Sequence, residues 1–563
     1  MSSAAGLWRS ALGTARKLVY ARAKKSTDFV KEFKHMDLSK LEMPKFEMPK
    51  FEMPKFEMPK FELPSFELPS FELPKIIQGG MGVGVSNWRL AQAVSRLGQL
   101  GVVSGTALDT LFVRRLVDGD SGGHMKRAID AFPFQEMARR VWNEYFVPGG
   151  KPADAAYPAL TMHQAKQQRK VAELLMVSNF AEVFLAKEGH KNPVGINFLE
   201  KVQMPHLASI YGAMLAGVGY VLMGAGIPLH IPGVLDALAA QHAAVYKLAV
   251  VGATEDVYMN FDPADYAEGK LPELVRPKFL AIVSSNTLAT TMLRRASGKV
   301  DGLVYESPIA GGHNAPPRGK LQVNEAGEPL YGERDRISVE DLRALGVPFW
   351  LAGGYGSPGK VREAIEAGAT GVQVGTVFAL TEESGLRDDL KTELLSQVRE
   401  RRGHIFTDRL ASPTGFPFKV AVLEGTGSQL PIYEQRKRVC DLGYLREPYE
   451  GGDGKVGYRC AAEPVANYLA KGGKQEDTVG RKCLCNSLLA NVGHAQIRKD
   501  GRVEAALVTA GDDINTASEF MADGKMTYSV ADVVGQLLSR VRESQTATEP
   551  ELYGAPGMNP VFI

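Results

Sequence analysis

Eight short apolar segments, nearly all ending in Gly, Ser, Asn or Thr, alternate with amphipathic stretches along the middle of the chain. They begin near Ile76, Gly101, Pro193, Gly219, Phe279, Asp301, Pro348 and Gly371. Strand-sized apolar runs separated by helical patterns are typical of β/α units with a parallel sheet. Eight units predict a (β/α)8 barrel of the TIM type, an α/β fold whose active site lies at the carboxyl ends of the strands. A doubly wound open sheet is the alternative.

The composition is that of a globular protein. Of 563 residues, 44% are hydrophobic and 23% are charged, which excludes collagen, a disordered chain and a polytopic membrane protein. Lys and Arg (66) nearly balance Asp and Glu (64), so the net charge gives no reason to expect nucleic acid. Four cysteines and no secretory signal pattern predict a reducing, cytoplasmic environment.

One uncharged stretch, Leu207 to Leu235, is long enough to be considered as a membrane span. Its glycines and prolines divide it into a short helix, a strand and a turn. We therefore expect buried barrel core there.

Residues 1–40 contain nine Lys or Arg and three Asp or Glu. Trp8, Leu12, Ala15 and Val19 recur at helical spacing, which predicts a basic amphipathic targeting or docking segment. A helix on an anionic membrane surface, an organelle transit peptide, a docking peptide for a protein and a frayed terminus all fit this pattern.

Residues 41–75 repeat one pentapeptide seven times, as in FEMPK and FELPS, with proline at every fifth position. Proline at this spacing excludes helix and regular sheet and favours an extended, non-globular arm. The repeat is either a multivalent ligand offering Phe and a carboxylate in each copy or a semi-rigid spacer.

Two glycine turns follow the last two predicted strands. One contains Gly353 and Gly354, and the other contains Gly375 and Thr376. Free backbone amides at such turns favour a dianion, and the Thr376 hydroxyl adds a donor. Paired turns on the seventh and eighth units predict a phosphate site.

Several motifs follow one another along the predicted barrel: IIQGGMGVGVS at 76–86, LGVVSG, VGIN, MGAGIP, ESPIAGGHN at 306–314, LAGG and VQVGT. Together they resemble the nitronate monooxygenase (2-nitropropane dioxygenase) family, which is related to the flavin-dependent enoyl-acyl carrier protein reductases. The resemblance covers about residues 76–420 and implies FMN as cofactor. The residues that it implies for FMN binding are Gly80, Met81, Asn197, Glu306, Gly311, Gly354, Gln373, Gly375 and Thr376.

The resemblance also implies that His313, the histidine of the AGGH turn, is the catalytic base over the flavin. An imidazole is suited to proton transfer near neutral pH. The chain departs from the family pattern four residues earlier, where Ile309 replaces an acidic residue. This departure leaves the fold and the flavin as expected but puts the substrate in doubt.

The implied activity is that of an FMN-dependent monooxygenase that oxidises alkyl nitronates or nitroalkanes with O2. An NAD(P)H-dependent enoyl-thioester reductase is the alternative, although GVGVS lacks the fingerprint of a dinucleotide site. A cargo or scaffold protein acting through residues 1–75 is a third hypothesis. The expected partners are a small-molecule substrate, O2, a protein or membrane surface for the arm, and further copies in a homo-oligomer.

Two insertions interrupt the barrel pattern. About 85 residues between the second and third strands show two helical patterns, which predict a cap over the carboxyl face. His124 and His163 are its candidate contacts to the site, although a surface position is the simpler interpretation for each. Ala243 to Pro277 contains two strand-like runs that predict a hairpin.

The four cysteines are Cys440, Cys460, Cys483 and Cys485, all in the last quarter of the chain. A zinc or iron-sulfur site, a redox pair and unpaired thiols are the alternatives. The long spacings and the lack of C-x-x-C favour unpaired thiols, so no metal site is predicted. The expected domains are thus 1–40, 41–75, the FMN-binding barrel 76–420, and an α-rich extension 421–563.

Overall fold

The computed structural model describes residues 73–452, 454–522 and 524–546, all within a unit that runs from Glu67 to Ile563. The basic segment 1–40 and the repeat arm up to residue 72 lie outside the described residues. The predicted conformation and role of both segments therefore stay predictions.

Eight parallel strands form one sheet in the order β1-β10-β9-β8-β7-β4-β3-β2. They are β1 Ile76–Gln78, β2 Gly101–Ser104, β3 Val194–Leu199, β4 Tyr220–Gly224, β7 Lys278–Val283, β8 Gly302–Glu306, β9 Phe349–Ala352 and β10 Gly371–Val374. A parallel bridge between Ile77 and Leu100 joins the two ends of the sheet, where the Leu100 amide donates to the Ile76 carbonyl at 3.1 Å. The sheet thus closes into the predicted barrel, and each predicted strand coincides with one of the eight.

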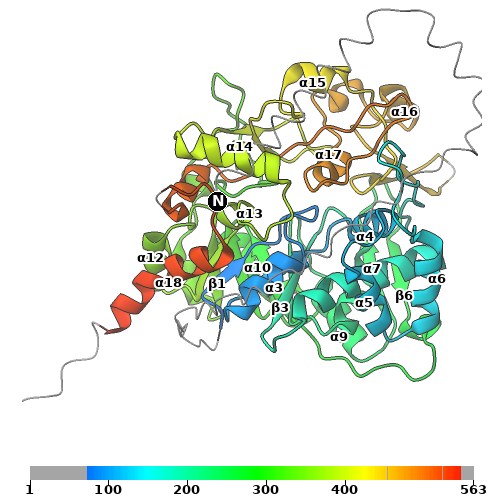
Figure 1. Ribbon diagram of the computed structural model, residues 1–563, viewed down its shortest axis with the longest axis horizontal. Helices are drawn as coiled ribbons and strands as arrows, with labels where there is room; N and C mark the ends of the chain where they lie inside the picture. Colours follow the sequence, from blue (N-terminus) through cyan, green and yellow to red (C-terminus); the bar gives the residue numbers. More distant parts are fainter. Residues whose placement is uncertain (1–72, 453, 523, 547–563) are drawn as a thin grey trace, which may run out of the picture. The chain divides into compact units, whose positions relative to one another are not determined.

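Helices lie between the strands along the chain and pack around the barrel (Figure 1). They are α3 Trp88–Arg96, α8 His206–Leu215, α9 Ile231–Ala239, α10 Asn286–Arg295, α11 Val339–Ala344, α12 Pro358–Glu366, α13 Thr376–Ala379 and α14 Asp388–Arg399. Polar side chains cap the start of three of these helices. The Asn87 side chain accepts the Leu90 amide at 3.0 Å at α3, Ser285 accepts the Leu288 amide at α10, and Ser338 accepts the Asp341 amide at α11.

The uncharged stretch from Leu207 to Leu235 forms most of α8, all of β4 and the start of α9. Within the described part of the chain, no helix is both long and apolar enough to cross a bilayer. Most of its residues are buried, as predicted, although Ile227 is 52% exposed.

Apolar side chains fill the inside of the barrel. They are Ile77, Leu100, Val102, Tyr220, Leu222, Leu280, Val304, Trp350 and Ala352. Leu73 packs against this cluster, and the indole Nε1 of the buried Trp350 donates to the Pro74 carbonyl at 2.8 Å. Both residues precede β1, so the described end of the last repeat copy, residues 73–75, is anchored at the amino-terminal end of the barrel.

The insertion between β2 and β3 is helical, as predicted. It contains α4 Leu108–Val117, α5 His124–Ala131, α6 Gln135–Tyr145 and α7 Arg169–Lys187, and α7 packs against α8 and α3. The second insertion contains the predicted hairpin, with β5 Ala244–Leu248 antiparallel to β6 Val257–Phe261, followed by η3 Pro263–Tyr266.

The chain after the barrel strands is built from short elements. They are β11 Ile405–Asp408, β12 Phe418–Ala421, α15 Leu430–Gln435, β13 Glu447–Glu450, β14 Val456–Arg459, α16 Val465–Ala470, η5 Gln475–Thr478, α17 Leu484–Ala490, η6 Ile514–Phe520 and α18 Val530–Thr546; η4 Glu333–Asp335 lies earlier, after β8. The final helix α18 returns to the barrel and packs against α12 and α3 (Figure 1).

Candidate active site

A cavity of about 220 Å³ lies at the carboxyl ends of the barrel strands. Its wall is made by the residues that end or follow β1, β3, β4, β8, β9 and β10, together with residues of the C-terminal part of the chain. All ten residues named from the sequence line it: Gly80, Met81, Asn197, Glu306, Gly311, His313, Gly354, Gln373, Gly375 and Thr376. The fold therefore brings the whole predicted set to one place, although the role of each residue stays a prediction.

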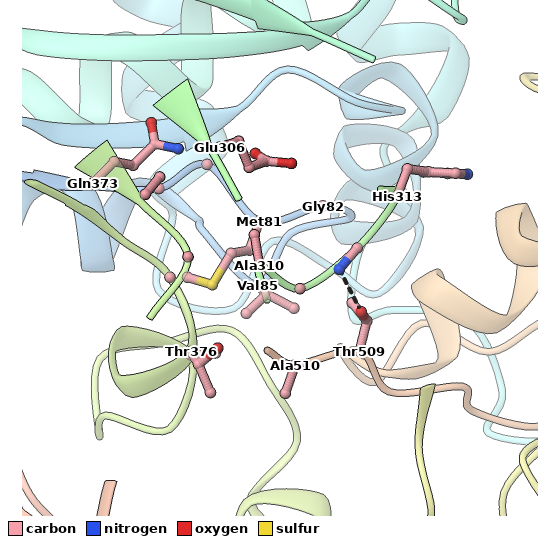
Figure 2. Close-up of a pocket in the computed structure, with 18 of the residues that line it drawn as sticks. Met81, Gly82, Val85, Glu306, Ala310, His313, Gln373, Thr376, Thr509 and Ala510 are labelled. Carbon is pink, nitrogen blue, oxygen red and sulfur yellow. Dashed lines mark hydrogen bonds between the residues drawn. The ribbon is translucent and has the colours of Figure 1, made fainter. Parts of the chain in front are cut away.

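The loop after β1 is fixed by two polar side chains. The Ser86 hydroxyl accepts the Met81 amide at 2.8 Å and donates to the Gly79 carbonyl at 3.0 Å. Buried Gln78 donates to the Ser86 hydroxyl at 2.8 Å and accepts the Val102 amide on β2 at 3.1 Å. Met81 is thus held in the cavity wall by hydrogen bonds within its own loop, as Figure 2 shows for its side chain.

Glycine is required where backbone and side chains meet most closely. A Cβ atom on Gly80 would lie 2.1 Å from the Asn197 Oδ1 atom. Gly353 and Gly354 have φ values of 80° and 84°, a left-handed conformation that strains other residues. The turn that was predicted to bind phosphate therefore depends on glycine for its shape.

Two side chains in the wall carry oxygen atoms without a partner. The Oδ1 atom of Asn197 and the Oε1 atom of Gln373 are buried and accept no hydrogen bond from any described residue. A buried acceptor without a donor costs free energy of about 1–3 kcal/mol. These two atoms are therefore suited to accept N–H or O–H groups of a bound ligand.

Glu306 ends β8 and lines the same cavity. Burial raises the pKa of its carboxyl group to about 7. At neutral pH the side chain is therefore divided between a neutral acid that can donate a hydrogen bond and a charged carboxylate.

His313 is positioned by a contact outside the barrel sheet. Its Nε2 atom lies 2.7 Å from the Ser412 hydroxyl, and its ring packs edge-on against Phe418, with centroids 4.9 Å apart. Burial and the charge of Lys201 lower the pKa of His313 to about 4. The imidazole is therefore uncharged at neutral pH and offers one donor and one acceptor.

The C-terminal part of the chain closes one side of the cavity, which is the position that we expected for an extension packed on the barrel. Thr509, Ala510 and Asp513 line it, and the Gly312 amide donates to the Thr509 hydroxyl at 2.8 Å (Figure 2). The Gly511 amide donates to the Thr376 hydroxyl at 2.9 Å. This segment therefore touches both the AGGH turn and the predicted phosphate turn.

An ion pair between a buried lysine and a partly exposed aspartate ties this segment to β12. Lys419 Nζ lies 2.6 Å from Asp512 Oδ2 and 2.7 Å from the Thr407 hydroxyl. The Lys419 amide also donates to the Gly312 carbonyl at 2.9 Å. Lys419 thus joins the turn that carries His313 to the C-terminal segment.

Asp513 lies at the turn that was assigned to phosphate. Its carboxylate accepts the Gly354 amide, and burial together with the charge of Asp512 raises its pKa. No motif marks Asp513, because its place in the wall depends on a segment far along the chain from β9. The adjacent carboxylates of Asp512 and Asp513 in TAGDD were the only local signal.

Neither histidine of the first insertion lines the cavity. The His124 ring lies 4.9 Å from the Trp88 ring, outside the site. His163 is buried, not on the surface, and its Nε2 atom lies 3.0 Å from Asp109 Oδ2. The suggested contacts between these residues and the site are therefore wrong.

Residues 238–402 match the model of a protein family described as "Nitronate monooxygenase". They run from the end of α9 to just beyond α14 and include β7, β8, β9 and β10. No curated protein matches the chain.

Solved structures similar to this chain include FabK from Thermotoga maritima, with a TM-score of 0.41 and 16% identity over 84% of this chain and 94% of that one. Nitroalkane oxidase from Streptomyces ansochromogenes has a TM-score of 0.39 and 15% identity, over 85% of this chain and 98% of that one. The enoyl reductase domain of MlnA from Bacillus amyloliquefaciens has a TM-score of 0.41 and 11% identity, over 84% of this chain and 96% of that one. At these values the similarities carry no inference about activity.

Proposed function

We propose that this chain is a flavin-dependent oxidoreductase that uses FMN to oxidise alkyl nitronates with O2. Its residues 238–402, which contain the last four strands of the barrel, match the nitronate monooxygenase family. The observation that carries the proposal is the position of His313 in the cavity and the uncharged form of its imidazole at neutral pH. It lines the cavity, contacts Ser412 at 2.7 Å and has a pKa of about 4.

The cavity wall fits a flavin. The unpartnered oxygens of Asn197 and Gln373 can accept the polar hydrogens of the ring and ribityl chain. The glycine turn at Gly353 and Gly354 and the neighbouring Gly375 offer backbone amides to the phosphate. When bound, FMN supplies the electron-accepting ring.

The charges of His313 and Lys201 favour an anionic substrate. A neutral imidazole with a pKa of about 4 is a weak base for removing a proton from a neutral nitroalkane. A nitronate has already lost that proton, and its oxygens can accept a hydrogen bond from the uncharged His313. The nearby charge of Lys201, which lowers the pKa of His313, also attracts an anion. We therefore assign His313 the task of orienting the nitronate.

Glu306 adds a pH-dependent feature. Below its pKa of about 7, the neutral carboxyl can donate a hydrogen bond to an anionic substrate. Above that pH, the carboxylate repels the substrate. Binding of nitronate is thus expected to be best on the acidic side of neutrality.

The test uses the purified full-length protein and its visible spectrum under anaerobic conditions. We expect the flavin bands to be bleached by ethyl nitronate, slowly or not at all by nitroethane, and not by NADPH. Rapid bleaching by NADPH would instead favour the enoyl-thioester reductase. A colourless protein that takes up no added FMN would overturn the flavin proposal and leave a scaffold function for the chain.

The further partners remain part of the proposal. O2 and a small-molecule substrate follow from the proposed chemistry. From the sequence we also propose a homo-oligomer and a cytoplasmic location. Residues 1–75 would recruit the protein to a membrane surface or an assembly. Most of that arm lies outside the described residues.

A further inference from the structure

A second cavity, of about 130 Å³, is lined by residues between 427 and 507, after the last barrel strand. It is separate from the candidate active site, because no described residue lines both cavities. Ser487 and Leu507 line the second cavity, whereas their neighbours Leu488 and Val508 line the first. Helix α17 and the chain at 507–508 therefore lie between the two cavities.

The wall of the second cavity is basic. Four cationic side chains line it: Arg436, Arg438, Arg481 and Lys482. Among the described residues, the only carboxylate in this wall is that of Glu434, which is an exposed residue. The charge of Arg436 is already paired, because its guanidinium donates to both carboxylate oxygens of Glu504, at 2.7 and 3.0 Å. Three cations of the wall are left to be accounted for.

Neutral groups hold these three cations in place. Arg438 donates to two backbone carbonyls, at 2.6 and 3.2 Å, and Arg481 donates to three, at 2.7, 2.8 and 2.9 Å. Lys482 donates to the Gly427 carbonyl at 3.1 Å, and its Nζ atom lies 4.1 Å from the centre of the Tyr433 ring. Within the described chain none of the three cations forms an ion pair, so their charges are oriented but not compensated.

The surroundings of these cations favour a bound anion. All three side chains belong to partly buried residues, and burial lowers the pKa values of Arg481 and Lys482. The carboxylates of Asp408 and Asp477 act on these two cations only from beyond ion-pair distance. Burying a charge without a partner costs free energy. An anion in the cavity removes part of that cost, and several uncompensated cations favour an anion with more than one negative charge.

The donors and the size of the cavity suit a phosphate group. Arginine binds phosphate oxygens through paired N–H groups, and lysine adds a point charge. Within the described residues, the Nη2 atom of Arg481 donates to no acceptor, and Lys482 uses one of its three N–H groups. The cavity is roughly tenfold larger than the 10–15 Å³ that one water needs. It can therefore hold a phosphate together with a second phosphate or an ester group, against apolar Ile432 and Leu507.

We propose that the cavity bordered by Arg438, Arg481 and Lys482 binds a phosphate-bearing anion, either inorganic pyrophosphate or the phosphate group of an ester. The binding is reversible, and no covalent bond forms or breaks. Arg481 also donates to the carbonyl of Ser412, whose hydroxyl contacts His313. An anion held by Arg481 therefore also stabilises the loop that orients His313. This site is distinct from the glycine turns proposed to hold the phosphate of FMN.

The experiment is isothermal titration calorimetry of the full-length protein with pyrophosphate, at low ionic strength and with excess FMN present. We expect saturable binding of one pyrophosphate per chain. Lys482→Gln should weaken it roughly 10- to 100-fold, the value of one charge-assisted hydrogen bond. The control Lys437→Gln removes the same charge at an exposed position outside the cavity wall and should keep the wild-type affinity.

A second titration distinguishes the two sources of phosphate. ADP serves as the probe for an ester. Tighter binding of ADP than of pyrophosphate would support the cavity as a site for an ester, and tighter binding of pyrophosphate would support it as a site for the inorganic anion. In both cases Lys482→Gln must weaken the binding for the proposal to stand.

Three results would overturn the proposal: no saturable binding of either probe at millimolar concentration, an affinity that Lys482→Gln leaves unchanged, and equal weakening by Lys437→Gln. If Lys482→Gln is insoluble, hydrogen–deuterium exchange of the wild-type protein decides. Pyrophosphate should then protect residues 432–438 and 481–487, whereas protection confined to residues 353–376 would contradict the site. None of these measurements depends on nitronate oxidation, so this proposal can fail while the proposed function stands.

Discussion

The Nε2 atom of His313 and the hydroxyl oxygen of Ser412 lie 2.7 Å apart, across 99 residues of sequence. Ser412 is itself held, because its hydroxyl lies 2.8 Å from that of Thr414 and accepts the Thr414 amide at 3.2 Å. The imidazole is therefore oriented by a loop that is not part of any barrel strand.

Ser412→Ala removes this orienting contact. One neutral hydrogen bond is worth about 0.5–1.5 kcal/mol, so we expect kcat/KM for a nitronate to fall roughly 2- to 10-fold while flavin content stays unchanged. Steady-state kinetics at pH 7 measures this effect, with Ser539→Ala on the exposed face of α18 as control. An unchanged kcat/KM would show that His313 does not need Ser412.

Glu306→Gln should remove the pH dependence of KM for nitronate. The pKa of about 7 lies above the ordinary value of 4.5, so the carboxylate is disfavoured in the fold. Stability should therefore decrease as pH rises from about 4.5 to 7. Over the range around pH 7, KM for nitronate should rise in the wild type and stay flat in Glu306→Gln. Parallel profiles for the two proteins would contradict the role given to Glu306.

Asp513→Asn should strengthen FMN binding. The carboxylate accepts the amide of Gly354, where it competes with the phosphate and repels it. Because the pKa of Asp513 is raised, wild-type affinity should weaken as pH rises through that pKa, whereas the variant should show little change. Fluorescence titration with FMN at pH 5 and pH 8 measures this, with Asp500→Asn, an exposed residue, as control. Weaker binding by Asp513→Asn at both pH values would mean that Asp513 holds the cofactor.

Gly80→Ala tests the close approach of the Gly80 backbone to the Asn197 side chain. The added Cβ would lie 2.1 Å from Asn197 Oδ1, so Asn197 must move, at a cost of about 1–3 kcal/mol. We expect a lower Tm and loss of flavin. Gly359→Ala is the matched control, because nothing lies within 4 Å of its Cβ and it lies in α12, where alanine is the better helix former. Normal flavin content in Gly80→Ala would place the cofactor elsewhere.

Two truncations separate the arm from the barrel. Deleting residues 1–72 should leave stability and activity unchanged. Deleting residues 1–75 also removes the Pro74 carbonyl that accepts the buried Trp350 Nε1, which should lower the free energy of unfolding by about 1–3 kcal/mol. Urea unfolding of the two proteins side by side measures the difference. Equal stability would show that the anchor contributes nothing.

Much of the barrel could be predicted because its signals are local. Each strand is a short apolar run, nearly all of the predicted runs end in Gly, Ser, Asn or Thr, and the strand order follows from the β/α alternation. The ten site residues lie at strand ends, so barrel geometry alone brings Gly80, Glu306 and Gly375 to the same edge.

The rest of the site depends on contacts that local pattern does not encode. Thr509 and Asp513 follow a stretch with few regular elements, and only packing against Gly312 and Gly354 reveals their place. His163 looked like a surface residue because its partner Asp109 lies 54 residues earlier in the chain. Long-range polar pairs of this kind leave no periodic signal.

One side of the cavity wall is synthesised late, because it is formed by Thr509, Ala510 and Asp513. A ribosome completes all eight barrel strands by Val374, yet this side of the wall is made much later. A nascent or prematurely terminated chain with an intact barrel thus still lacks part of the cavity wall, where we propose that the flavin binds. Flavin retention in the cell would then report translation beyond Asp513, and chains terminated between Val374 and Thr509 would remain colourless.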